Sequence, residues 1–221
     1  MTLGVLGGTF DPIHNGHIAA GLRAQEALQL DRVMLVPSHI PPHRAGALGA
    51  PAEARLAMAA LATAEQQGWT ASDIELKRRG PSYTFDTLTE LAKRGGGEWQ
   101  FFFIIGADAF AEVATWSRYP AVLDLAHFAV VARPGITLHS LQARVPDLAD
   151  RMTTPDSFKL EAASPKPGDK TRVILIETAT PDVSSTEIRR RVRAGESIAG
   201  MVPDSVASYI STHHLYVEAN L

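Results

Sequence analysis

The sequence predicts an α/β protein with a doubly wound, mostly parallel sheet and helices on both faces. Three observations lead to this expectation. Short apolar runs alternate with segments of helical spacing along the 221 residues. Residues 3–36 fit a strand, a helix and a second strand, and such a βαβ unit implies parallel pairing with a right-handed crossover. The most apolar run, residues 99–105, is typical of a central strand buried on both faces.

The first half of the chain supplies most of the expected elements. Apolar runs predict strands at residues 3–6 and 32–36, and Ile74-Glu75-Leu76 predicts a short or edge strand because three basic residues follow it. Helical spacing predicts one helix from near His17, one from Pro51 to about Gln67 and one from Thr84 to Gly95. The inner face of the second helix should carry Leu56, Ala59, Ala60 and Thr63.

The second half continues the alternation. Strands are predicted at residues 127–132 and 173–176, with a helical piece around 138–148 between them. Residues 153–170 lack any periodicity and predict a mobile loop, and the region from 135 to 172 matches no motif. A helix capped by Ser184 should end at Gly195, and a last helix should begin at Pro203. The chain is expected to form one domain over residues 1–221.

Composition narrows the class of protein. The chain is 45% hydrophobic and 20% charged, which is ordinary for a globular protein, and its formal net charge of −3 gives no basic field for nucleic acid. It has no cysteine, which excludes disulfides and fits a reducing compartment. Met1 leads directly into the first predicted strand, and no apolar run approaches the roughly 20 residues of a membrane span. We therefore expect a cytoplasmic protein without membrane or nucleic-acid partners.

The opening stretch carries the main functional signal. The first predicted strand ends in Gly7 and Gly8, and a helix follows within ten residues. A glycine turn before a helix brings backbone N–H groups and the positive end of the helix dipole to one point, which suits a phosphate. The spacing fits neither a G-x-G-x-x-G nor a Walker-type motif. His14 and His17 lie at the same point, and without a cysteine or an obvious third ligand we expect no protein-bound metal there.

Two later segments add polar groups. Asp108 follows the central strand, where open α/β sheets bind ligands, and it could hold a ribose, cap a helix or do both. Ser184 and Glu187 have the spacing of a capping box, which is sufficient to account for the serines. Capping does not account for the three arginines 189–191 in the first turns of that helix, where the dipole disfavours cations. A polyanion bound against these arginines would account for their position, because it would neutralise their charge.

Four stretches together resemble the bacterial nicotinate-nucleotide adenylyltransferases of the H-x-G-H nucleotidyltransferase superfamily. They are Gly7-Gly8-Thr9-Phe10-Asp11-Pro12 with His14-Asn15-Gly16-His17, then Pro41-Pro42-His43-Arg44, then Gly80-Pro81-Ser82-Tyr83-Thr84, and finally Ser184-Ser185-Thr186 with Ile188-Arg189. The first and last are shared by the wider superfamily, while the two middle stretches indicate the nicotinate branch. The resemblance implies a Rossmann-like nucleotidyltransferase fold.

The resemblance also implies an activity, a set of ligands and roles for individual residues. The activity is transfer of the adenylyl group of ATP to nicotinate mononucleotide, with magnesium accompanying the ATP, in NAD biosynthesis. Catalytic roles are implied for His14, His17 and Arg189. Contacts with ATP are implied for Gly7, Gly8, Thr9, Phe10, Gly106, Asp108, Arg133, Ser184, Ser185 and Thr186. Contacts with nicotinate mononucleotide are implied for His43, Arg44, Tyr83, Thr84 and Trp116.

Two other functions remain compatible with the sequence. Another member of the superfamily, with nicotinamide mononucleotide or phosphopantetheine as acceptor, would share the first and last motifs. A non-catalytic nucleotide sensor would share the fold, although a sensor would not need His14, His17 and Arg189. The sequence does not indicate an oligomeric state or how strictly nicotinamide is rejected.

Overall fold

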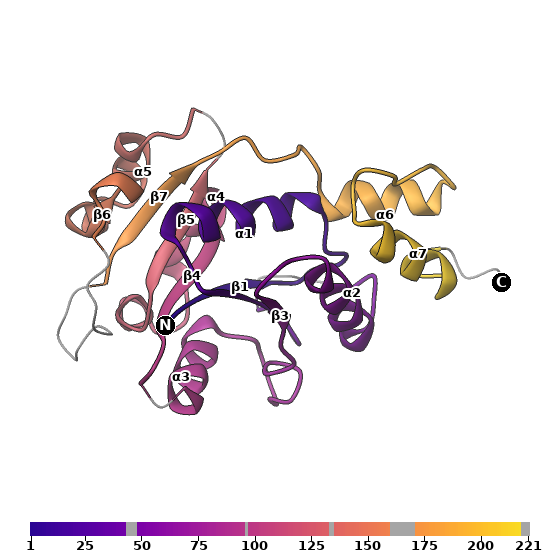
Figure 1. Cartoon of the computed structure of the whole chain (residues 1–221), viewed down its shortest axis with the longest axis horizontal. Helices are drawn as coiled ribbons and strands as arrows, with labels where there is room; N and C mark the ends of the chain where they lie inside the picture. The colour runs from indigo at the N-terminus through magenta and orange to yellow at the C-terminus, as the bar shows by residue number, and fades with distance from the viewer. Residues whose placement is uncertain (43–47, 96, 133–134, 160–170, 218–221) are drawn as a thin grey trace.

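The computed structural model describes residues 1–42, 48–95, 97–132, 135–159 and 171–217 (Figure 1). A seven-stranded sheet runs through the described part of the chain in the order β3-β2-β1-β4-β5-β7-β6, and each of its strand pairings is parallel. Its strands are β1 (Thr2–Gly8), β2 (Arg32–Pro37), β3 (Trp69–Ala71), β4 (Gln100–Gly106), β5 (His127–Ala132), β6 (Met152–Thr153) and β7 (Val173–Glu177). The predicted α/β class is confirmed.

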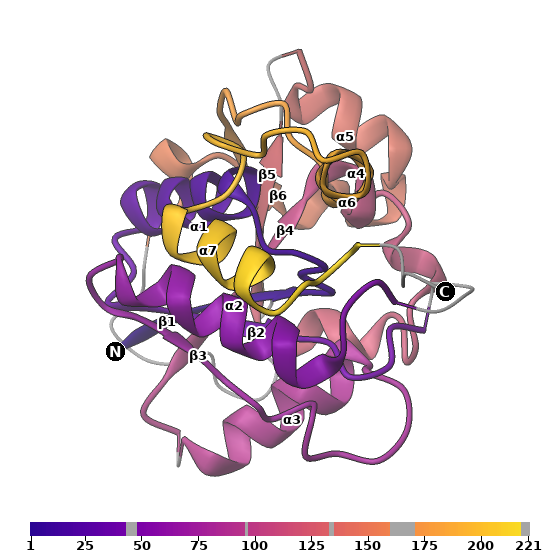
Figure 2. The ribbon, with the colours of Figure 1, turned by 90° about the vertical axis from the view of Figure 1, so that its right-hand side faces the viewer.

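Helices cover both faces of this sheet. They are α1 (Asn15–Leu28), α2 (Ala52–Ala64), α3 (Thr84–Arg94), α4 (Ala107–Phe110), α5 (Leu138–Arg144), α6 (Ser185–Arg193) and α7 (Asp204–Thr212), joined by short 3₁₀ segments. Helices α1 and α3 lie on opposite sides of β1 and β4 (Figure 1), and α7 lies against α2 (Figure 2). The arrangement is doubly wound.

Two apolar clusters fill the space between the sheet and its helices. One contains residues of α1, α2, α6 and α7, and the other contains residues of α3, α4 and α5. Strand β4 contributes Phe102 and Ile104 to the first cluster and Phe103 to the second, because successive side chains of a strand point to opposite faces. The expectation of a central strand buried on both faces is thus confirmed.

The strand order fixes where a ligand can bind. The chain leaves β1 for β2 and β3 on one side, then returns to place β4 on the other side of β1. In open α/β sheets a crevice forms outside the carboxyl ends of the two strands at such a reversal. Gly7 and Gly8 end β1, and Gly106 ends β4, so both glycine segments of the sequence lie at this point.

The first helix begins at Asn15, near His17 as predicted, with His14 in the N-cap position. Two other predicted elements were wrong in detail. Residues 74–76 form turns instead of a strand, since the strand pairing with β2 is made by Trp69–Ala71 just before them. The helical piece predicted over 138–148 is split, because Pro146 cannot continue α5 and begins a 3₁₀ segment.

The inner face of α2 also differs from the prediction. Leu56 is only partly buried and Ala60 is exposed. The buried positions are Arg55, Met58, Ala59, Ala62 and Thr63. The helix is therefore rotated so that a charged side chain faces inward, which hydrophobic spacing could not predict.

The region after α5 was expected to be irregular. Residues 152–153 form the short edge strand β6, residues 155–157 form a 3₁₀ turn, and Phe158 packs against the first apolar cluster. Residues 160–170 of the predicted loop lie outside the described residues. None of the helices in the described ranges is long and apolar enough to cross a membrane.

Candidate active site

A pocket of about 670 Å³ opens at the carboxyl ends of β1 and β4. It is lined by residues 5–9, from β1 and the turn after it, and by residues 103–109, from β4 and α4. His14, Gly16 and His17 line one side at the start of α1. Residues 82–84, at the start of α3, line another side together with Trp116. The fold therefore places around one cavity the residues predicted to bind phosphate and those predicted to bind the pyridine nucleotide.

The glycines at the end of β1 have packing reasons of their own. A Cβ on Gly8 would lie 2.9 Å from Cε1 of Phe10, and one on Gly7 would lie 3.1 Å from Cζ of Phe103. Phe10 has a φ of +49° and is 1% exposed, and its ring stands edge-on to that of His17 with centroids 5.1 Å apart. Phe10 does not line the described pocket, so its side chain supports the turn from behind.

The two histidines are stacked on each other at the start of α1. Their ring centroids are 3.7 Å apart with an angle of 25° between the planes. The backbone N–H of His14 donates to Nδ1 of His17 at 3.3 Å, so a neutral His17 carries its proton on Nε2. Gly16 permits this arrangement, because a Cβ there would lie 3.1 Å from the His14 ring. Nδ1 of His14 is buried and has no hydrogen-bond partner among the described residues.

Burial sets the charge of this pair. It lowers the pKa of His14 to about 4. Burial, and then the proximity of His14, lower the pKa of His17 well below 6.5. Both rings are therefore neutral at pH 7 in the free protein, and each can donate one N–H. An anion bound beside them would favour protonation and raise both pKa values.

A buried arginine that the sequence did not reveal holds the turn after β1. Arg55 of α2 is fully buried, and its guanidinium donates to the carbonyl oxygens of Thr9 at 2.7 Å and Ser38 at 2.6 Å. It also donates to the carbonyls of Ala50 and His39. The turn after β1 is thereby tied to the loop after β2. The available signal was the spacing of four residues between Arg55 and Ala59, which places both on one helical face.

Asp11, in the first motif, is the centre of a second buried cluster. Its carboxylate accepts from the backbone N–H groups of Gly49 and Ala50 at 2.8 and 3.0 Å and from the Tyr216 hydroxyl at 3.0 Å. Nη1 of Arg189 donates to the Asp11 carbonyl at 2.7 Å and lies 3.7 Å from the carboxylate. The cluster joins residues more than 200 positions apart, a pairing without any local sequence signal.

Helix α6 is capped differently from the prediction. Ser184 accepts from the backbone N–H of Glu187 at 3.2 Å, which is one half of the expected capping box. The Glu187 carboxylate instead binds Arg190 and Arg191, and Arg190 also binds Glu196. Two of the three arginines thus have carboxylate partners within the helix and the turn after it. The argument that this cluster requires a polyanion was wrong for them.

The remaining residues of the predicted triphosphate clamp connect α6 to the first motif. Ser185 donates to the carbonyl of Pro12 at 2.9 Å, and Thr186 accepts from Nη2 of Arg189 at 3.3 Å. Ser184, Ser185, Thr186 and Arg189 are not among the residues that line the described pocket. Contact between this helix and a triphosphate stays a prediction.

Asp108 and Gly106 lie where the sequence placed them, at the end of β4. Both line the pocket. Gly106 occupies the N-cap of α4 and Asp108 lies within its first turn, so the capping role considered for Asp108 was wrong. The Asp108 side chain is 85% exposed and lies 3.5 Å from Arg144. An exposed carboxylate on the pocket rim is accessible to a ligand, and its ribose contact stays a prediction.

The predicted pyridine side is built by α3 and the loop after β2. Tyr83 is the N-cap residue of α3, and with Thr84 and Trp116 it lines the pocket. Ser82 is fixed by two contacts, since its N–H donates to the Ile40 carbonyl at 2.8 Å and its hydroxyl accepts from the His39 N–H at 2.9 Å. Of the other predicted ligand contacts, His43, Arg44 and Arg133 lie outside the described residues.

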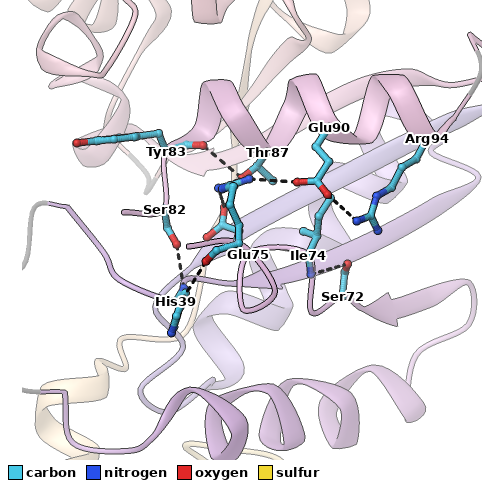
Figure 3. A network of polar contacts seen from close by, with 10 residues as sticks. His39, Ser72, Ile74, Glu75, Ser82, Tyr83, Thr87, Glu90 and Arg94 are labelled. Carbon is cyan, nitrogen blue, oxygen red and sulfur yellow. Dashed lines mark hydrogen bonds and ion pairs between the residues drawn. The ribbon is translucent and has the colours of Figure 1, made fainter. Parts of the chain in front are cut away.

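A buried glutamate on the pyridine side was not predicted from the sequence. Glu75 is 7% exposed and lines the pocket. Its Oε1 accepts from the Thr87 hydroxyl at 2.5 Å, while Oε2 has no hydrogen-bond partner in the described part of the chain. Burial raises the pKa of this carboxyl. Figure 3 shows Glu75 below Thr87, in a network that continues through Glu90 to Arg94.

Sequence comparison decides the family. The profile of the cytidylyltransferase-like proteins matches residues 5–191. A probable nicotinate-nucleotide adenylyltransferase of Thermus thermophilus is 42% identical, over 98% of this chain and 100% of its own length. Another, of Desulfatibacillum aliphaticivorans, is 39% identical, over 98% and 100%. The chain belongs to the nicotinate-nucleotide adenylyltransferase family. The family expected from the four motifs and the class of nucleotidyltransferase are confirmed.

Solved structures confirm the fold of this family member. A Plasmodium falciparum nicotinic acid mononucleotide adenylyltransferase complexed with NaAD is similar with a TM-score of 0.71 and 16% sequence identity, over 97% of each chain. The same enzyme complexed with APC gives a TM-score of 0.69 over 97% of this chain and 96% of that one. At this identity the likeness concerns the fold, and the residue roles rest on the geometry described above.

Proposed function

We propose that this pocket binds ATP and nicotinate mononucleotide together and transfers the adenylyl group, giving nicotinate adenine dinucleotide and pyrophosphate. The observation that carries the proposal is the convergence of three elements on one cavity. These are the glycine turn after β1, the stacked histidines at the start of α1, and the Tyr83 and Trp116 side of the pocket. The names of relatives that are 39–42% identical over nearly the whole chain support it.

The reaction requires positioning and charge stabilisation more than covalent chemistry. An oxygen of the acceptor phosphate forms a bond to the α-phosphorus of ATP, and the bond from that phosphorus to the bridging oxygen breaks as pyrophosphate leaves. Backbone N–H groups of Gly7, Gly8 and Thr9 and the dipole of α1 would receive the phosphates. His14 and His17 would donate to the oxygens on which charge builds in the transition state.

Magnesium would enter with ATP. No group of three or more His, Cys, Asp or Glu side chains that could hold a metal ion occurs in the ranges that the structure describes. Magnesium prefers oxygen ligands and keeps several waters, and in nucleotide sites it is commonly held by substrate phosphates. We therefore treat magnesium–ATP as the substrate and assign the ion no protein cage.

We assign the other contacts with ATP from the positions of the predicted residues in the fold. Asp108 on the rim would hold ribose hydroxyls, and Gly106 would let the nucleotide approach the backbone at the end of β4. Ser184, Ser185, Thr186 and Arg189 would contact the β- and γ-phosphates if α6 closes toward the pocket. The lack of cysteine supports a reducing, cytoplasmic setting.

We expect kcat/KM with nicotinate mononucleotide to exceed that with nicotinamide mononucleotide by at least roughly tenfold. The start of α3 lines the pocket at Tyr83 and Thr84, and a helix N-terminus with hydroxyl groups favours a carboxylate. An amide there would turn its NH₂ toward donors and leave buried groups unpaired. Pyrophosphate release with magnesium, ATP and each acceptor measures the ratio.

The same assay tests the alternatives. Equal rates with the two pyridine nucleotides would make a dual-specificity enzyme the better description. Turnover with phosphopantetheine alone would assign another branch of the superfamily. ATP binding without turnover on any acceptor would indicate a sensor.

A further inference from the structure

The last described residues of the chain return to the first motif. Figure 2 shows the chain after α7 passing between α2 and α6, and Tyr216 in this segment is buried in the first apolar cluster. Its hydroxyl donates to Oδ1 of Asp11 at 3.0 Å. The backbone of Tyr216 has a φ of +65°, which a bulky side chain rarely adopts. Such a conformation persists only where the surrounding contacts fix it.

The Tyr216 hydroxyl is one of several donors to the Asp11 carboxylate. Burial, and then the charge of Asp11, raise the pKa of Tyr216, so the hydroxyl stays protonated at neutral pH and donates. The backbone N–H groups of Gly49 and Ala50 donate to Oδ2 at 2.8 Å and to Oδ1 at 3.0 Å. A carboxylate has about four lone-pair positions, so these three donors fix its orientation.

Arg189 lies beside this carboxylate but is bound to the backbone. Its Nη1 is 3.7 Å from Oδ2 of Asp11, beyond hydrogen-bond distance, and donates to the Asp11 carbonyl at 2.7 Å. Its Nη2 donates to the Thr186 hydroxyl. A Cβ on Gly49 would lie 2.8 Å from both Cδ of Arg189 and the ring of Tyr216. The arginine and the tyrosine are therefore packed closely around Asp11.

This arrangement leaves Arg189 with charge and donors for another anion. A buried carboxylate and a guanidinium usually form a direct, often bidentate pair. Here the carboxylate is held by other donors, and the two hydrogen bonds described for Arg189 use two of the five N–H groups of its guanidinium. The segment that leads into α6 lines the pocket at Thr180, Pro181 and Val183. The anion nearest to this helix is therefore a phosphate bound in the pocket.

We propose that Tyr216 is a positioning residue for ATP: by holding the orientation of the Asp11 carboxylate, it prevents a closer ion pair with Arg189 and keeps the guanidinium available to the triphosphate. This inference rests on the proposed function and deepens it, because it gives the end of the chain a part in ATP binding. Tyr216 touches no substrate and acts through Arg189.

The test is Tyr216→Phe, which keeps the ring and its packing and removes only the hydroxyl. Without this donor the carboxylate turns toward Arg189, and the resulting ion pair competes with ATP for the guanidinium. We expect the KM for ATP to rise about tenfold, the change that corresponds to one hydrogen bond to a charged group. At saturating ATP, kcat and the KM for nicotinate mononucleotide should stay close to the wild-type values.

Tyr209→Phe is the matched control. Tyr209 lies in α7, packs against the same apolar cluster and stacks on His213. The change removes a tyrosine hydroxyl from the same part of the chain and should leave the KM for ATP unchanged. Because KM does not depend on the fraction of folded enzyme, partial destabilisation of Tyr216→Phe does not obscure the comparison.

A double variant tests the route through Arg189. If Tyr216 acts only through this arginine, adding Tyr216→Phe to Arg189→Ala should cause no further rise in the KM for ATP. A purely structural tyrosine would lower stability in both backgrounds and leave the KM for ATP of Tyr216→Phe at the wild-type value. The Kd for magnesium–ATP without acceptor, measured by titration calorimetry, should show the same pattern.

The outcomes separate this inference from the function on which it rests. A Tyr216→Phe protein with the wild-type KM and Kd for ATP would overturn the inference, whatever its stability. An equal rise in the Arg189→Ala background would also overturn it, since Tyr216 would then act by another route. A wild-type protein that binds magnesium–ATP but releases no pyrophosphate with nicotinate mononucleotide would refute the proposed function, and the calorimetric comparison would still decide the role of Tyr216.

Discussion

Replacing His17 by alanine is expected to lower kcat by roughly 10²–10³, the cost of losing one preorganised donor to the transition state. Nε2–H of His17 is the free donor of the ring, because Nδ1 already accepts from the His14 backbone. The change leaves the strands and the apolar clusters intact, so the melting temperature should stay close to that of the wild type. Single-turnover rates with saturating ATP and acceptor measure the effect.

His213→Ala is the control for this change, because His213 is exposed and stacks on Tyr209 in α7. It should leave kcat unchanged. A His17→Ala enzyme with full turnover and normal melting would show that this ring is not a catalytic donor.

The charge state of His14 and His17 also predicts how activity depends on pH. Burial lowers the pKa of His14 to about 4 and that of His17 well below 6.5, so raising the pH from 6 to 8 removes little positive charge from the pair in the free enzyme. After correction for ionisation of the substrate phosphates, kcat/KM for ATP should therefore not fall over this range, since that ratio reports on the free enzyme. A fall centred near 6.5 would show that a protonated histidine is the donor.

Replacing Arg189 by alanine should raise the KM for ATP sharply and also destabilise the fold. From the sequence alone one would expect unchanged or improved stability, because the change removes a cation from the expected N-terminal turns of a helix. In the structure Arg189 is 16% exposed and donates to the Asp11 carbonyl, so its loss leaves a buried cluster incomplete. We expect a cost of about 1–3 kcal/mol in the free energy of unfolding, measured by denaturant titration.

Arg190→Ala is the matched control on the same helix. Its ion pairs with Glu187 and Glu196 are half exposed, and such surface pairs contribute about 0–1 kcal/mol. Arg190→Ala should therefore lower the free energy of unfolding by no more than about 1 kcal/mol. It should leave the KM for ATP unchanged. An Arg189→Ala enzyme with lowered stability and an unchanged KM for ATP would make Arg189 a structural brace and remove it from the triphosphate site.

The layers of this fold could be predicted from its sequence because each strand is a short apolar run. Burial on both faces of a parallel sheet requires such runs, and residues 99–105 and 127–132 are too short and too continuously apolar for an amphipathic helix. Residues 74–76 show the limit of this reasoning. Their apolar pattern resembles a strand, but Trp69–Ala71 take the place beside β2, and only tertiary pairing decides between two neighbouring candidates.

The sequence predicted those parts of the candidate site whose residues are neighbours in the chain. The turn after β1 and the two histidines form one local unit, so their spacing carries the signal. Arg55, Tyr216 and Glu75 were missed because each reaches the site from a distant segment and has the composition of an ordinary helix or turn. Glu75 was assigned to a strand, and only the actual turn at 74–76 directs its carboxyl toward α3 and the pocket.

Product analysis with ATP labelled in the α-phosphate tests the central claim most directly. The protein is incubated with magnesium, labelled ATP and nicotinate mononucleotide, and the products are separated. Adenylyl transfer predicts that the label enters a dinucleotide while an equal amount of unlabelled pyrophosphate is released. Label that remains in ATP, or that appears in ADP with transfer of the terminal phosphate, would contradict attack on the α-phosphorus and with it the assignment of this pocket.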